Sequence, residues 1–213
     1  MAIEKDILMA TSFEPASTPR LRCELHNAIT HFAHSTFECD MTDPRSIELV
    51  HFGSKRWANY FKVVLLGLQS VLPPEVRQNA HGTIKVLVDG TVPPESSLSS
   101  SAAMTTCSSI VILTALKALH EVPRKVIADV ACHSERLVGV QSGGMDEAVS
   151  VFGQRDKALF VSFAPTLHVS PIELPLGHQY VFLVTNTMIK SDKKAPAPER
   201  YNLRVVETRV AAA

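Results

Sequence analysis

Residues 86–104 read V-L-V-D-G-T-V-P-P-E-S-S-L-S-S-S-A-A-M and join the end of a predicted strand to the start of a long predicted helix. The strand is expected over 82–88, and the helix from Ser99 to just before Pro123. The first N–H groups of a helix have no partner within it and lie at the positive end of its dipole, so they readily bind anions. This order of strand, loop and helix predicts a phosphate site. A simple N-cap at Ser99 explains the same residues without a ligand.

Strand-like and helix-like patterns are mixed along the rest of the chain. Alternating apolar residues predict strands, and apolar residues at steps of three and four predict helices. The strands are expected over 6–13, 21–25, 158–163, 168–174 and 179–185, and the helices over 57–72, 125–137, 145–152 and from 199 onward. Because strands and helices do not alternate regularly, the order favours an α+β fold.

The composition is that of an ordinary globular protein, with 213 residues of which 46% are apolar and 20% charged. Lys plus Arg number 21, as do Asp plus Glu, so the chain lacks the basic excess typical of nucleic-acid binders. The best apolar run, 109–119, is too short to cross a membrane, and no signal peptide opens the chain. The four cysteines have no C-x-x-C spacing. We therefore expect a cytoplasmic protein without nucleic-acid or membrane partners.

Three motifs resemble those of one kinase family. The loop before Ser99 resembles the phosphate loop of GHMP kinases, which ends G-L-S-S-S-A. Residues 134–148, S-E-R-L-V-G-V-Q-S-G-G-M-D-E-A, closely resemble the galactokinase segment that bears the catalytic aspartate. Residues 201–208, Y-N-L-R-V-V-E-T, resemble fungal galactokinases, and the motifs follow the family's order. By resemblance this is fungal-type galactokinase sequence of the GHMP family, or that of its N-acetylgalactosamine kinase or galactose-sensor relatives.

The resemblance implies a fold and an activity. The expected fold is the α+β N-terminal domain of GHMP kinases, which is like domain 2 of ribosomal protein S5, over 1–175. The start of their C-terminal domain would follow over 176–213. The implied activity is the ATP- and Mg²⁺-dependent phosphorylation of galactose, or a related hexose, at its 1-hydroxyl. The alternatives are a non-catalytic sensor that binds galactose, ATP and a transcriptional inhibitor, and an inert fragment.

The family's residues for nucleotide and metal can be carried over by position. The positions that match nucleotide contacts are Ser97, Ser99, Ser100 and Ser101. The resemblance also gives Ser100 and Glu135 as Mg²⁺ ligands, and Mg²⁺ does prefer a few carboxylate and hydroxyl oxygens. A surface carboxylate paired with Arg136 or Lys125 is the equally acceptable interpretation of Glu135.

The sugar side of the site is expected after the second motif. By resemblance, Asp146 accepts the proton of the sugar 1-hydroxyl or stabilises the attacking oxygen, as phosphoryl transfer needs mainly positioning and charge. The backbone of Gly143 and the ring of Tyr201 match positions that touch galactose. Without the family, Asp146 reads as a cap of a short helix, and Tyr201 as a helix-start residue packed on the core.

An apolar stripe on the helix 57–72 has two readings. One interpretation places Trp57, Asn59 and Tyr60 near a nucleotide. Burial of the stripe in the core is the favoured interpretation. The nine histidines show no metal-ligand spacing and are expected to be structural or exposed.

Three residues depart from the family's pattern. Ser97 stands where the loop has glycine, and Glu95 stands two positions earlier, so an obstructing side chain and a negative charge enter the phosphate loop. Glu147 replaces the usual glutamine and puts a second carboxylate beside Asp146. The family's first motif, which grips galactose, and its third, a Gly-rich phosphate lid, are not in this sequence. We therefore expect an internal fragment with impaired activity.

Overall fold

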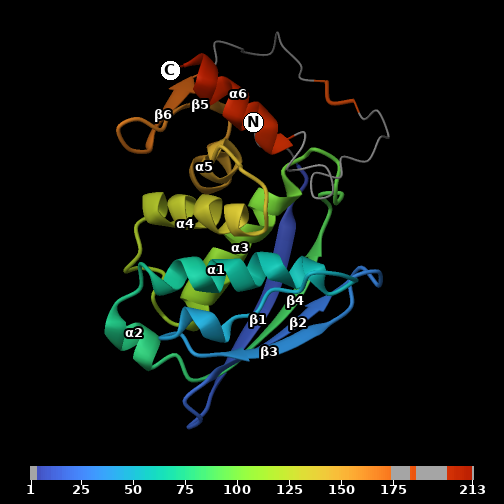
Figure 1. Cartoon of the computed structure of the whole chain (residues 1–213), viewed down its shortest axis with the longest axis vertical. Coiled ribbons are helices and arrows are strands. Elements are labelled where there is room, and N and C mark those ends of the chain that lie inside the picture. Colours follow the sequence, from blue (N-terminus) through green and yellow to red (C-terminus); the bar gives the residue numbers. More distant parts are fainter. Residues whose placement is uncertain (1–3, 174–182, 186–200, 213) are drawn as a thin grey trace.

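A mixed four-stranded sheet forms one side of the molecule (Figure 1). The computed structural model describes residues 4–173, 183–185 and 201–212. The strands of this sheet are β1 (Ile7–Pro15), β2 (Leu21–Asn27), β3 (Ser35–Cys39) and β4 (Gly82–Gly90), in the spatial order β1-β4-β2-β3. β4 is antiparallel to β1 and parallel to β2, and β2 is antiparallel to β3. The mixed sheet, with helices on one face, confirms the α+β class.

The helices lie on one face of the sheet, and a small hairpin and the last helix lie at the far end (Figure 1). The helices are α1 (Asn59–Gln69), α2 (Pro74–Gln78), α3 (Ser100–Ala115), α4 (Arg124–Leu137), α5 (Met145–Phe152) and α6 (Asn202–Ala211). The hairpin pairs β5 (Lys157–Ser162) with β6 (His168–Glu173). α1 and α3 lie between the sheet and α4, and α5 follows beyond α4.

The core fills the space between the sheet and the helices. The inward residues of β2 and β4 are fully buried, whereas their outward neighbours form ion pairs such as Arg22 with Glu24. The apolar stripe of the helix 57–72 does belong to this core, since Phe61, Val64 and Leu65 are fully buried. Each such side chain contributes roughly 1.5–3 kcal/mol when removed from water.

Two short elements were not predicted. β3 alternates weakly because Ser35, a polar residue, occupies one of its inward positions and is 4% exposed. α2 has only one turn and begins with Pro74, which the sequence pattern assigns to a helix end, although proline is also favoured in a first turn. The strand expected over 179–185 lies mostly outside the described residues, and 183–185 belong to no strand. The domain boundary expected at 175/176 also lies outside them.

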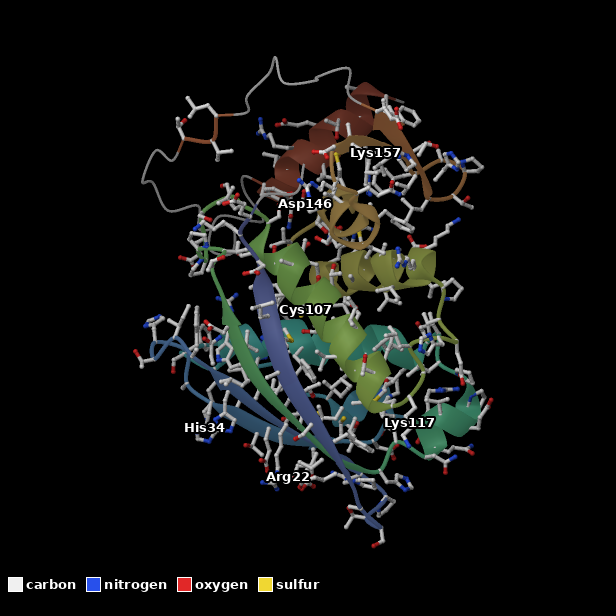
Figure 2. The ribbon with its side chains drawn as sticks, turned by 180° about the vertical axis from the view of Figure 1, so that it is seen from behind. Arg22, His34, Cys107, Lys117, Asp146 and Lys157 are labelled. Carbon is white, nitrogen blue, oxygen red and sulfur yellow. The ribbon has the colours of Figure 1, made fainter. Side chains whose placement is uncertain are left out.

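The helix predicted from Ser99 to just before Pro123 is longer than the helix observed, α3. α3 ends at Ala115 because Lys117 adopts the left-handed conformation, with φ of 57°. The N–H of Ala118 then donates to the carbonyl of Leu113 at 2.8 Å, as in the Schellman ending of a helix. Glycine is the usual residue at this position, so the pattern gave no signal of the ending. Figure 2 shows Lys117 at this end of α3.

Replacing Lys117 with glycine should stabilise the fold. A side chain in the left-handed region costs on the order of 1 kcal/mol, and glycine removes that cost while adding some unfolded-chain entropy. We expect Lys117→Gly to raise Tm by about 1–3 °C in calorimetry. Lys117→Ala removes the charge and keeps the strain, so an equal gain in that control would contradict the conformational explanation.

Candidate active site

A cavity of about 520 Å³ opens where the loop after β4 meets the first turn of α3. Its lining includes all four serines expected to contact a nucleotide, namely Ser97, Ser99, Ser100 and Ser101. Trp57 and Tyr60 line it from the start of α1, and Glu135 from α4. The structure thus brings together the nucleotide and metal candidates, which lie on three separate helices and one loop.

The loop before α3 has an unusual backbone. Glu95, Ser97 and Ser99 have φ values of 58°, 60° and 56°, although none is glycine. Side chains rarely adopt this region and are strained by roughly 1–3 kcal/mol each. Left-handed residues alternating with residues of negative φ turn successive N–H groups toward one concave side, an arrangement that binds anions. The glycine that the family has at the position of Ser97 therefore suits the conformation that this chain adopts.

Ser99 does not act as a side-chain cap. It occupies the N-cap position of α3, but its hydroxyl makes no capping hydrogen bond. The N–H of Ala103 is the first to bond back along the helix, to the carbonyl of Ser99 at 3.0 Å. The capping interpretation is wrong in this respect. The helix itself supplies no partner for its first N–H groups, and Ser99, Ser100 and Ser101, which carry them, line the cavity.

Glu135 is a buried carboxylate, which excludes the interpretation as a surface ion pair. Its side chain is 4% exposed and lines the cavity. Arg136, the partner considered for it, instead donates from Nε to the carbonyl of Ser142 at 3.1 Å. The negative charge of Glu135 acts on Tyr60, whose pKa is raised first by burial and then by this charge.

Asp146 and Gly143 lie beside the cavity rather than in its lining. Asp146 is an exposed residue in the first turn of α5, and Gly144, with φ of 85°, holds the N-cap position that Asp146 might have taken (Figure 2). Gly143 is exposed, and a Cβ added to it would meet no atom within 4 Å. The surface in front of both residues is therefore open.

Tyr201 joins the two parts of the site. Burial raises its pKa first, followed by the charges of Glu135, Asp146 and Glu147. Glu135, which acts on Tyr201, also lines the cavity. Tyr201 directly precedes α6 and is partly buried, so its interpretation as a helix-start residue packed on the core also stays open.

The sequence gives no sign that Glu147, the residue next to Asp146, is buried. It is 0% exposed, and burial followed by the hydrogen bond and charge of Glu135 raises its pKa to about 8. Two carboxylates can share a hydrogen bond only if one is protonated, and as an ionised group Glu147 has no hydrogen-bond partner for either oxygen. A neutral Glu147 has nearly the shape of glutamine and can donate one hydrogen bond, whereas the glutamine amide can donate two.

Trp57 and Asn59, just before and at the start of α1, differ in whether they reach the cavity. Trp57 is buried and donates from Nε1 to the carbonyl of Ala33 at 2.8 Å, yet one side of it lines the cavity. Asn59 is 3% exposed and its amide is bonded to the backbone of Val50 at both ends, so it does not face a ligand. No cluster of three or more potential metal-ligating His, Cys, Asp or Glu occurs within the described residues.

Comparison with known proteins defines the class. Residues 59–154, which contain the phosphate loop and the segment of Asp146, match the GHMP kinases N terminal domain. This part of the chain therefore matches the GHMP kinase family, as the first two motifs predicted. No helix in the described part of the chain is long and apolar enough to span a bilayer.

Within this family the chain is most clearly similar to galactokinases. It is 32% identical over 219 residues to a galactokinase of Schizosaccharomyces pombe and 34% identical over 213 residues to one of Candida albicans. These alignments cover 99% and 100% of this chain but 41% and 40% of the relatives, so the chain spans about two fifths of their length. Its fold resembles that of Lactococcus lactis galactokinase complexed with galactose, with a TM-score of 0.69 and 21% identity over 98% of this chain and 48% of that one.

The buried acid predicts a pH-dependent effect of Glu147→Gln. The folded chain keeps a proton on Glu147 up to about pH 8, whereas the unfolded chain, with the ordinary value of 4.5, has released it. This contribution to stability is complete below pH 4.5 and is lost as the pH rises through 8. The Tm gain of Glu147→Gln should therefore be small near pH 5 and reach about 2–8 °C near pH 9.

Differential scanning fluorimetry across this range measures the effect. Glu121→Gln, at an exposed position, is the control and should show no such trend. A gain for Glu147→Gln that is the same at both ends of the range would contradict the account.

The two glycines before Asp146 differ in whether the fold has room for a side chain, and alanine substitutions test this difference. Gly143→Ala should leave Tm within about 1 °C, because its Cβ meets nothing. Gly144→Ala should lower Tm by about 3–10 °C, because it forces a side chain to φ of 85° and to within 2.9 Å of Cys132 Sγ. Thermal melts of both variants test this, and equal losses would show that the surface before Gly143 is not open.

Proposed function

We propose that this chain carries the nucleotide- and sugar-facing parts of a galactose 1-kinase. The observation that supports this most is the single cavity into which the strained loop, the first turn of α3 and the buried carboxylate of Glu135 all open. The similarity to galactokinases supports the choice of galactose as the hexose. Free thiols at all four cysteines fit a reducing compartment, which supports a cytoplasmic location.

The nucleotide would enter this cavity with its phosphates toward α3. Backbone N–H groups of the first turn and of the loop 95–99 would donate to phosphate oxygens, with the hydroxyls of Ser97, Ser99 and Ser101 beside them. The adjoining surfaces of Trp57 and Tyr60 suit the apolar face of a base. ATP is therefore the nucleotide we propose.

Mg²⁺ fits a carboxylate and a hydroxyl in the lining of the same cavity. Glu135 is a buried carboxylate, and among the described residues no ion pair neutralises it. Together with the hydroxyl of Ser100 it offers the oxygen ligands that Mg²⁺ takes alongside phosphates. When bound, the ion would neutralise charge on the transferring phosphoryl group.

The sugar would lie in the open surface before Gly143, between Asp146 and Tyr201. The Asp146 carboxylate would hold the proton of the 1-hydroxyl as that oxygen forms a bond to the γ-phosphorus. The bond from the γ-phosphorus to the bridging oxygen would break, and ADP would leave. The backbone at Gly143 would allow close approach because no Cβ occupies that surface.

Calorimetric titrations with Mg·ATP and with galactose, beside a coupled assay of ADP release, test the proposal. We expect binding of Mg·ATP that Ser100→Ala weakens by about three- to tenfold. Binding of both ligands without turnover would identify a ligand-responsive protein rather than a working kinase. Absence of any Mg·ATP binding at millimolar concentration would reject the proposal.

Restoring glycine in the loop should strengthen the binding of the nucleotide. Glu95 places a negative charge among phosphate donors, and removing a like charge at about 4 Å is worth on the order of 1 kcal/mol. We expect the double variant Glu95→Gly/Ser97→Gly to bind Mg·ATP about fivefold more tightly, or more, by calorimetry. Ser96→Gly is the control, because Ser96 lies in the same loop without a left-handed φ. A double variant no tighter than the control would show that both departures are harmless.

A further inference from the structure

One amide side chain connects α6 to the segment that precedes Asp146. Asn202 is the first residue of α6. Its Oδ1 accepts from the N–H of Gln141 at 3.0 Å, and its Nδ2 donates to the carbonyl of Gly139 at 3.1 Å. The two partners lie 61 and 63 residues away in sequence. Both ends of the amide are thus used on the backbone between α4 and α5.

This backbone segment leads directly to the sugar-facing residues. It is turned at Gly139, with φ of 101°, and is held from its own side by Arg136, whose Nε donates to the carbonyl of Ser142. Gly143 follows at once, and Asp146 lies one helical turn farther on. Asn202 therefore fixes the segment from the opposite side, through a different element of the fold.

The apolar contacts of α6 do not account for its position. None of its residues is buried, and Leu203, Val206 and Val210 are 40%, 54% and 72% exposed. A helix normally gains its place by burying an apolar face. Here the specific link to the rest of the site is polar and directional, and it involves the residue next to Tyr201.

We propose that Asn202 is a positioning residue of the sugar site, which holds Tyr201 and the backbone before Gly143 in one fixed arrangement. Tyr201 contributes its ring from α6, while Gly143 and Asp146 come from the segment that the amide clamps. Loss of the amide would remove both of these bonds between α6 and the segment, so the two halves would present galactose with a wider range of relative positions. The inference rests on the proposed function, because it takes galactose to be the ligand.

The experiment uses the full chain with Asn202→Ala and Asn202→Asp. Alanine removes both bonds, whereas aspartate keeps the acceptor for the Gln141 N–H and loses the donor to Gly139. Thr208→Ala is the control, since Thr208 lies on α6 and its hydroxyl bonds only within that helix, to the carbonyls of Arg204 and Val205. The measurements are galactose and Mg·ATP affinity by calorimetry, and amide hydrogen exchange at Gln141 by NMR.

We expect Asn202→Ala to weaken galactose binding about five- to tenfold, because the two neutral hydrogen bonds that hold the segment are lost. The affinity for Mg·ATP should be unchanged. Asn202→Asp should keep slow exchange at Gln141 and recover part of the galactose affinity, and Thr208→Ala should match the parent chain. A merely structural role would lower both affinities together. Parental galactose affinity in Asn202→Ala, with accelerated exchange at Gln141, would overturn the inference. A parent chain that binds Mg·ATP but no galactose would instead reject the sugar half of the proposed function, and the inference with it.

Discussion

The burial of most of α3 is the constraint on which the rest of the structure depends. α3 packs against β1, α1, α4 and α5. Two of its buried hydroxyl groups bond to the helix itself, that of Thr105 to the carbonyl of Ser101 and that of Ser109 to the carbonyl of Thr105. A helix packed against four other elements cannot shift along its axis without disturbing those neighbours. Its N-terminus is therefore a fixed point, and the first N–H groups stay at one edge of the core.

Strain in the loop before α3 follows from that fixed point. β4 is held in register between β1 and β2, and α3 is held by the core, so the residues between them must turn sharply in a short span. Left-handed conformations at Glu95, Ser97 and Ser99 achieve the turn. The unfavourable local geometry is tolerated because the burial on either side is worth more. The same turn forms the concave wall of the cavity.

The second half of the site depends on buried charge. Glu135 is fixed on α4 and Glu147 on α5, and both helices pack in the interior, so the two carboxyl groups cannot separate to reach water. The high pKa of Glu147 relieves the repulsion, since a neutral acid can donate to its neighbour. The partly buried phenol of Tyr201 adds a third polar group to this cluster from α6. The cluster links the nucleotide side of the site to the sugar side.

The sequence by itself determined the class of the fold and predicted which residues form the loop before α3. Strong apolar periodicity marked β2, β4, α1 and α4, because side chains that face a core must recur with the period of their element. The weak β3, the single turn of α2 and the early end of α3 escaped prediction. Their signals are a polar inward residue, a proline used in a first turn, and a lysine in a place where glycine is usual.

Only the tertiary structure decided which of the marked residues meet. Sequence spacing could not choose between a surface Glu135 and a buried one, since burial depends on what α4 packs against. It also gave no sign that Glu147 is enclosed or that Asn59 is already occupied by the backbone of Val50. The amide of Asn202 reaches residues more than sixty positions away. Such long-range contacts arise from the folding of separate elements onto one core, and a local pattern carries no record of them.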